Sequence, residues 1–176
     1  MSNLPLLERT ELTADFHSPD LIPVAQREAR ISTFSPEKKY LATAGLGPCI
    51  ALVLYNVNTK TGALAHLDSM TGLEDEENLL EEYIKKAGRE NTVAYLVGGE
   101  KDKSEDIIER IQNLLSLHKI GIKGADLLNR SHENIVLDLE TGTPYKIPPK
   151  DVAAFAKRIK PMTPEELHRA HLTIQS

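Results

Sequence analysis

Cys49 and His66 are the residues whose chemical types and spacing point most directly to catalysis. Cys49 is the only cysteine of the chain and follows a tight glycine-proline turn, Ala44-Gly45-Leu46-Gly47-Pro48. His66 lies seventeen positions further on (66 minus 49), inside a second apolar run. A thiol and an imidazole on one surface make a nucleophile and the base that activates it. The question is whether the fold brings these two side chains together.

Each residue also has a purely structural interpretation. A free cysteine that opens an apolar run is often a small core residue, and a half-buried strand often carries one hydrogen-bonded histidine. The turn before Cys49 favours the catalytic hypothesis. Gly45 and Gly47 permit backbone angles barred to other residues, and they let a substrate approach closely.

Two predicted strands must position the pair. Apolar runs at Ile50–Tyr55 and Gly62–Leu67 flank the segment Asn56–Thr61, whose composition is typical of a hairpin turn. In an antiparallel pair, directly opposed residues share a face and have residue numbers with a constant sum. The turn therefore decides how Cys49 and His66 are placed.

Two registers keep the pair on one face. A two-residue loop at Val57-Asn58 places Cys49 directly opposite His66, whereas a turn centred on Asn58-Thr59 makes His66 its diagonal neighbour. The backbone positions are then about 4.5–8 Å apart. An odd loop or a bulge would move one side chain to the other face and separate the pair.

The composition is that of a soluble globular protein of one domain. The chain has 176 residues, 40% of them hydrophobic, and a net charge of -5, so we expect no nucleic-acid partner. No apolar stretch reaches the roughly 20 residues of a membrane span, and we expect no membrane insertion. The N-terminus lacks the features of a secretory signal. With one cysteine, we expect a cytoplasmic, reducing location, and export by a signal-independent route stays open.

The remaining pattern predicts an α/β (α+β) fold in a single domain, with largely antiparallel sheet packed against about two long helices. Residues 1–30 carry several prolines and little periodicity, so we expect an extended arm there, with room for short ordered pieces. Further strands are predicted at Tyr40–Thr43, Thr92–Val97, Gly121–Leu127, Asn134–Leu139 and Pro144–Ile147. Helices are predicted at Glu74–Ala87, after a Ser104 cap, at Asp151–Ile159 and at Pro164–His171.

The segment around the cysteine resembles a known active-site block. Thr43-Ala44-Gly45-Leu46-Gly47-Pro48-Cys49-Ile50-Ala51, with Gly62-Ala63-Leu64-Ala65-His66 after the turn, is similar to CheD, the bacterial chemoreceptor glutamine deamidase family. That family places a threonine six positions before its cysteine and a histidine seventeen after it. Ala65-His66-Leu67-Asp68 and Leu96-Val97-Gly98-Gly99 resemble protein N-terminal asparagine amidohydrolase more strongly. Both families belong to a cysteine deamidase group that includes the cytotoxic necrotizing factor catalytic domain.

The resemblance implies a role for each matched residue. Cys49 would be the nucleophile, His66 the base, and Thr43 the residue that orients the imidazole. Backbone amides of the Gly47-Pro48-Cys49 turn would hold the oxyanion, although Pro48 itself has no N–H to donate. The expected substrate-binding positions are Gly45, Gly47, Asp68, Gly98 and Gly99. Asp68 also has a simpler interpretation, as a cap on the loop that follows its strand.

The resemblance also implies a domain organisation and an activity. A CheD-like deamidase domain would span residues 31–150, between the arm of residues 1–30 and a C-terminal helical extension over residues 151–176. The expected activity is hydrolysis of a side-chain amide of glutamine or asparagine in a protein or peptide, with no cofactor and no metal. Pro48 stands where CheD-like sequences usually have a small residue, which argues against a chemoreceptor glutamine as the substrate.

Three alternatives stay open at this point. The chain could be an N-terminal asparagine amidohydrolase specifically. It could be a non-catalytic protein-binding module on the same fold, with Cys49 retained for packing. Transglutamination or proteolysis by the same pair is the third alternative.

Overall fold

The fold is built on two sheets, one of six strands and one of four. The computed structural model describes residues 14–128, 133–147, 149–159, 163, 165 and 171–176. The six-stranded sheet has the order β10-β2-β5-β4-β6-β7. Its strands are β2 (Glu28–Thr33), β4 (Ile50–Asn56), β5 (Thr61–Leu67), β6 (Thr92–Gly98), β7 (Gly121–Leu127) and β10 (Thr173–Gln175).

The four-stranded sheet has the order β1-β3-β8-β9. Its strands are β1 (Leu21–Pro23), β3 (Tyr40–Leu46), β8 (Glu133–Asp138) and β9 (Pro144–Lys146). Five of the strand pairs in the two sheets are antiparallel, and the pairs β1–β3, β6–β7 and β2–β10 are parallel. The expected α+β fold with largely antiparallel sheets is therefore confirmed.

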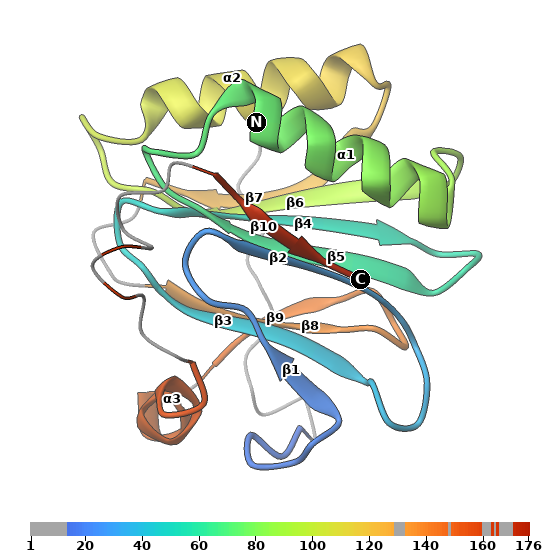
Figure 1. Cartoon of the computed structure of the whole chain (residues 1–176), viewed down its shortest axis with the longest axis vertical. Coiled ribbons are helices and arrows are strands. Elements are labelled where there is room, and N and C mark those ends of the chain that lie inside the picture. The colour runs from blue at the N-terminus through green and yellow to red at the C-terminus, as the bar shows by residue number, and fades with distance from the viewer. Residues whose placement is uncertain (1–13, 129–132, 148, 160–162, 164, 166–170) are drawn as a thin grey trace.

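Helices cover the outer faces of the two sheets. The long helices α1 (Leu73–Ala87) and α2 (Glu105–Leu117) lie side by side over the six-stranded sheet, and the short helix α3 (Pro149–Ala156) lies on the far side of the four-stranded sheet (Figure 1). Acids occupy the first turn of α1 and lysines its last, as its dipole favours. In the described residues, no helix is long and apolar enough to cross a membrane.

Strand alternation divides the buried side chains into three clusters, one for each interface between layers. Ile50, Leu52 and Leu54 of β4 point toward α1 and α2. Cys49, Ala51 and Val53 belong to a second cluster, which lies between the two sheets with residues of β3 and β8. The third cluster joins the outer face of β3 and β8 to Phe155 of α3. Cys49 therefore lies in the layer between the sheets.

The N-terminal and C-terminal segments contain short strands that the sequence did not locate. Residues 14–30, expected as part of an extended arm, contain β1 and the start of β2, with Phe16, Leu21 and Val24 buried. Pro23 fits because β1 is an edge strand, where a missing N–H is tolerated. At the other end β10, which we did not expect, pairs with β2. The helix expected at Pro164–His171 falls largely outside the described residues, as does the arm over residues 1–13.

Candidate active site

The β4–β5 register places Cys49 and His66 on one face. Ala51 pairs with His66, and Ile50 with Leu67, so paired residue numbers sum to 117 and the second of the two expected registers is adopted. His66 is therefore the diagonal neighbour of Cys49. Diagonal positions have backbones about 7–8 Å apart, a gap that a long side chain such as an imidazole can bridge.

Thr43 reaches the same layer from the opposite sheet. Leu41 of β3 belongs to the inter-sheet cluster, and alternation puts Thr43, two positions later, on the same face. Its Oγ1 lies 2.8 Å from Nδ1 of His66 and donates a hydrogen bond of 2.8 Å to the carbonyl oxygen of Val24. Each sheet thus contributes one member of a buried hydrogen-bonded pair.

This hydrogen-bond chain selects the tautomer of His66. The Thr43 hydroxyl has one proton, and the Val24 carbonyl can only accept it. The contact between Thr43 and Nδ1 is therefore satisfied when Nδ1 carries the ring proton and donates it to Oγ1. In that tautomer Nε2 has no proton and offers a lone pair. The network thus prepares His66 to accept a proton at Nε2.

Nε2 of His66 is buried and has no hydrogen-bond partner among the described residues. The residue is only 3% exposed. Burial lowers the pKa of His66 to about 4, against a smaller opposite effect of the Asp68 carboxylate. The imidazole is therefore neutral at pH 7. An unpaired buried nitrogen costs free energy, so its retention calls for an explanation.

Cys49 is held by the loop that follows β6. Its carbonyl oxygen accepts a 2.9 Å hydrogen bond from the amide of Gly99, and the Pro48 carbonyl accepts one of 2.7 Å from the hydroxyl of Ser104. Ser104 was expected to cap α2 but makes no side-chain cap bond. Gly98 has φ +103°, and a Cβ there would lie 2.5 Å from the Cys49 carbonyl oxygen. The glycine pair thus holds the cysteine backbone in place.

The thiol of Cys49 is protonated in this environment. Cys49 is 6% exposed. Burial raises the pKa of the thiol to about 11, and the Asp68 carboxylate acts in the same direction while Arg27 opposes it. Thiol and imidazole are therefore both neutral at rest. Proton transfer between them has to accompany attack on a substrate.

The turn before Cys49 offers fewer amide donors than its sequence suggests. Gly45 has φ +80° at a bulge in β3, and its amide donates to the side chain of Asn134 at 2.9 Å. The amide of Gly47 donates to the carbonyl of Gly45, also at 2.9 Å. Because both amides have partners within the protein, the expected oxyanion role of Gly47 needs correction. The amide of Cys49 is the donor from this turn that we assign to the oxyanion.

Asp68 has partners other than His66. Its Oδ2 accepts hydrogen bonds from Nε of Arg27 at 2.7 Å and from Nε2 of Gln26 at 2.6 Å. Its Oδ1 accepts from the amide of Met70, while its own amide donates to Thr71. Asp68 thus closes the loop after β5, the simpler of the two interpretations given above. Burial opposes its ionisation, but the bonds from Arg27 and Gln26 outweigh burial and lower its pKa.

Sequence reasoning missed the contribution of residues 24–27. Val24 supplies the carbonyl that orders the Thr43–His66 chain, and Arg27 pairs with Asp68. The apolar run Leu21-Ile22-Pro23-Val24 could have indicated an edge strand. Nothing in the sequence pairs Arg27 with Asp68, because the two residues are distant in the chain. In the described residues, no group of three or more histidine, cysteine or acidic side chains could hold a metal ion.

Fold and site together define an α+β protein with a buried cysteine, histidine and threonine between two sheets. No family model matches the chain. An uncharacterised protein of Acanthamoeba polyphaga mimivirus is 32% identical over 130 residues, which cover 58% of this chain and 48% of that protein. The chain thus spans about half the length of this curated relative. The crystal structure of the hypothetical protein YfiH from Bacillus licheniformis matches with a TM-score of 0.48 and 12% identity, over 68% of this chain and 66% of that one.

Proposed function

We propose that the protein is a cysteine-dependent deamidase that hydrolyses a side-chain amide of glutamine or asparagine in a protein or peptide. The observation that carries the proposal is the hydrogen-bond chain from Nδ1 of His66 through Thr43 to the Val24 carbonyl. It leaves the lone pair of Nε2 without a partner among the described residues, on the sheet face that also carries Cys49. The resemblance of this segment to CheD and to N-terminal asparagine amidohydrolase supports the same assignment.

The first half-reaction forms a thioester. Nε2 of His66 takes the thiol proton as the sulfur of Cys49 attacks the amide carbon of the substrate, forming the S–C bond. The amide of Cys49 donates to the oxyanion, an interaction worth about 2.7–4 kcal/mol per donor in comparable sites. The C–N bond then breaks, and the imidazolium returns its proton to the departing nitrogen, which leaves as ammonia.

The second half-reaction restores the enzyme. Nε2 takes a proton from a water molecule, whose oxygen attacks the thioester carbon. The C–S bond breaks, and the imidazolium protonates the sulfur of Cys49. The product is glutamate or aspartate at the position of the original amide. Throughout, Thr43 holds Nδ1 protonated, so each transfer uses Nε2.

The neutral resting pair sets the expected pH range. With the pKa of His66 at about 4, the base is unprotonated throughout the neutral range. The acidic limb of turnover should therefore lie near pH 4 rather than near 6.5, the ordinary value for histidine.

The direct test is ammonia release from synthetic peptides. Four peptides carry one amide each: internal glutamine, internal asparagine, N-terminal glutamine or N-terminal asparagine. The wild type should release ammonia from at least one of them, and Cys49→Ser should abolish the release while retaining the wild-type unfolding temperature. Turnover retained by Cys49→Ser would remove the thiol from the mechanism.

The same peptides separate the alternatives. Activity confined to N-terminal asparagine would favour the amidohydrolase over a deamidase of internal residues. Ammonia release that rises when a primary amine is added, with the amine joined to the peptide, would indicate transglutamination. If no ammonia is released from any of the four peptides and Cys49 does not react with iodoacetamide, a binding module would be favoured.

A further inference from the structure

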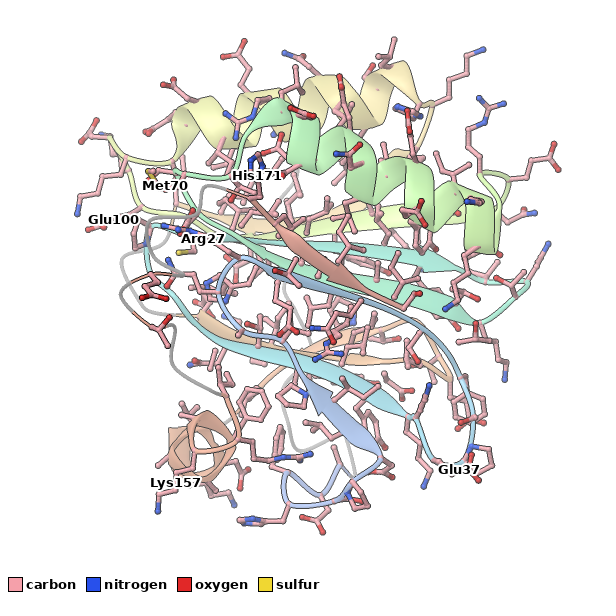
Figure 2. All side chains as sticks on the ribbon, viewed as in Figure 1. Arg27, Glu37, Met70, Glu100, Lys157 and His171 are labelled. Atoms are coloured by element: carbon pink, nitrogen blue, oxygen red, sulfur yellow. The ribbon has the colours of Figure 1, made fainter. Side chains whose placement is uncertain are left out.

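A buried ion pair beside Cys49 has no part in the mechanism described so far. Nε of Arg27 lies 2.7 Å from Oδ2 of Asp68, and the two side chains are 7% and 8% exposed. Figure 2 shows Arg27 at the same end of the molecule as Met70 and Glu100, which belong to the loops after β5 and β6. These loops border the site, because Gly99 and Asp68 lie in them.

The main chain of Arg27 is fixed in an unusual conformation. Its φ is +56°, in the left-handed region that costs a non-glycine residue about 1–2 kcal/mol. Its amide donates to the His66 carbonyl at 2.8 Å, and its own carbonyl accepts from Thr173 at 2.9 Å. Such a conformation persists where the surrounding structure determines it. The bonds to β5 and β10 thus hold the main chain of Arg27 next to His66, the proposed base.

The β4–β5 ladder ends at the pair Ile50–Leu67, and Cys49 and Asp68 are the next residues beyond that pair. The register, continued by one position, puts Asp68 across from Cys49. Its carboxylate acts on the thiol by raising the pKa, and the Arg27 charge acts in the opposite sense. The thiol therefore lies within the field of both members of the ion pair.

We infer that Arg27 is a positioning residue that balances charge at the nucleophile. By pairing with Asp68, it neutralises the carboxylate across from Cys49, so that the thiolate formed on attack meets an ion pair instead of a bare negative charge. The inference rests on the proposed roles of Cys49 and His66 and adds a residue through which the chain controls them.

The physical basis is the cost of placing two negative charges together in a dry site. A carboxylate and a thiolate that lie close together with little water destabilise each other, and a nearby guanidinium offsets this repulsion. Asp68 also favours the imidazolium form of His66. An Asp68–Arg27 pair therefore keeps the carboxylate beside the base while limiting its effect on the sulfur.

Other charged groups near the site are already paired. Glu100, on the loop after β6, forms an ion pair with Lys103 at 2.8 Å. Lys146 of β9 lies 3.1 Å from Asp126 of β7 and 3.6 Å from Glu133 of β8. The cluster that packs around Cys49 from β3, β4 and β6 is apolar, and the polar residue that β3 adds to this layer is the uncharged Thr43. Among the described residues, Asp68 and Arg27 are thus the charges that act on the thiol.

The test is the rate of Cys49 alkylation by iodoacetamide between pH 7 and 10, in the full chain. Arg27→Met should slow labelling about tenfold at a given pH, equivalent to an upward shift of about one pH unit. Arg27→Lys should retain most of the wild-type rate because it keeps the charge. The double variant Arg27→Met/Asp68→Asn should return toward the wild-type rate, because it removes the carboxylate that Arg27 offsets.

A loss of fold or of packing would not give this pattern. Arg158→Met is the matched control, since Arg158 donates to the carbonyls of Phe16, Ser18 and Leu21 on the other side of the four-stranded sheet. It should lower stability without moving the pH profile of labelling. Equal profiles for wild type and Arg27→Met, or a double variant as slow as Arg27→Met, would overturn the inference. If His66→Ala changes the labelling rate while Arg27→Met does not, the result would support the Cys49–His66 pair and exclude the proposed role of Arg27.

Discussion

The two ends of the β4–β5 hairpin carry buried polar residues that differ in how fully they are hydrogen-bonded. At the turn end, the paired residues Asn56 and Thr61 are each 2% exposed. Nδ2 of Asn56 donates to the carbonyls of Ala87 and Glu90, at 3.0 and 2.8 Å. Its Oδ1 accepts from the amides of Asn58 and Thr59. The side-chain nitrogen of Asn56 thus joins the hairpin to the segment that ends α1, and its side-chain oxygen closes the hairpin turn.

At the open end, His66 uses only half of its hydrogen-bonding capacity. Nδ1 bonds to Thr43, and Nε2 has no partner among the described residues. Both ends are equally buried, so burial alone does not distinguish a structural polar residue from a catalytic one. The difference lies in the unpaired nitrogen, which costs stability and is explained if it serves as a base for Cys49.

Removal of the base should give the largest effect. His66→Ala is expected to lower ammonia release from a responsive peptide by about 10²–10⁴-fold, the usual contribution of a general base. Initial rates at pH 7 measure it. The matched change at the other end, Asn56→Ala, should leave the rate unchanged once the protein is folded. Equal rates for wild type and His66→Ala would exclude the imidazole from catalysis.

The free energy of unfolding should depend on pH because Nε2 of His66 is buried and unpaired among the described residues. The pKa of His66 is about 4 in the folded protein and near 6.5 in the unfolded chain. The unfolded state therefore binds the proton first as the pH falls, and stability is lost between about pH 6.5 and 4. The loss amounts to about 3 kcal/mol. Urea unfolding of wild type and His66→Gln measures it, and the wild type should lose this stability relative to the variant as the pH falls. Parallel curves would contradict a buried neutral imidazole.

Asn56→Ala should act on stability alone. It removes the bonds to Ala87 and Glu90 and leaves the buried Ala87 carbonyl without this donor, so we expect a loss of about 2 kcal/mol in the free energy of unfolding. Iodoacetamide labelling of Cys49 in the folded variant should match the wild type. A change in the labelling rate would mean that the two ends of the hairpin are coupled. It would contradict a purely structural role for Asn56.

Substitution of Thr43 should give the smallest effect, a modest loss of turnover. Thr43→Val keeps the shape but removes the hydroxyl that selects the tautomer, and we expect about a tenfold loss of turnover. Thr43→Ser should restore most of it, because serine can form the same two hydrogen bonds. The ratio of the turnover rates of the serine and valine variants measures the contribution of the hydroxyl group. Equal activity in the valine and serine variants would reduce Thr43 to a packing residue.

The sequence predicts the hairpin and its shared face because both depend on local patterns. The continuous apolar runs at Ile50–Tyr55 and Gly62–Leu67 flank a turn segment, and either of the two turns with an even number of loop residues puts Cys49 and His66 on one face. The helices α1 and α2 follow from their apolar stripes and end signals in the same way. Such features depend on residues that lie close together in the chain.

Other parts of the site depend on long-range pairing and cannot be inferred locally. The positive φ of Arg27 arises from bonds to β5 and to a C-terminal strand, and the Val24 carbonyl reaches Thr43 through β1–β3 pairing. Ser104 has the sequence of a helix cap, yet its hydroxyl bonds the Pro48 carbonyl. In each case a tertiary contact took precedence over the local signal.

The pairing of Cys49 with His66 is tested most directly by the pH dependence of Cys49 alkylation by iodoacetamide in wild type and in His66→Ala. When the thiol proton passes to Nε2, no proton is exchanged with solvent, so this route is independent of pH. We therefore expect the wild-type rate to level off below about pH 7 and to fall near pH 4, where His66 is protonated. In His66→Ala the rate should keep falling tenfold per pH unit. Identical, steadily falling curves for the two proteins would show that Cys49 is a packed core thiol without a base.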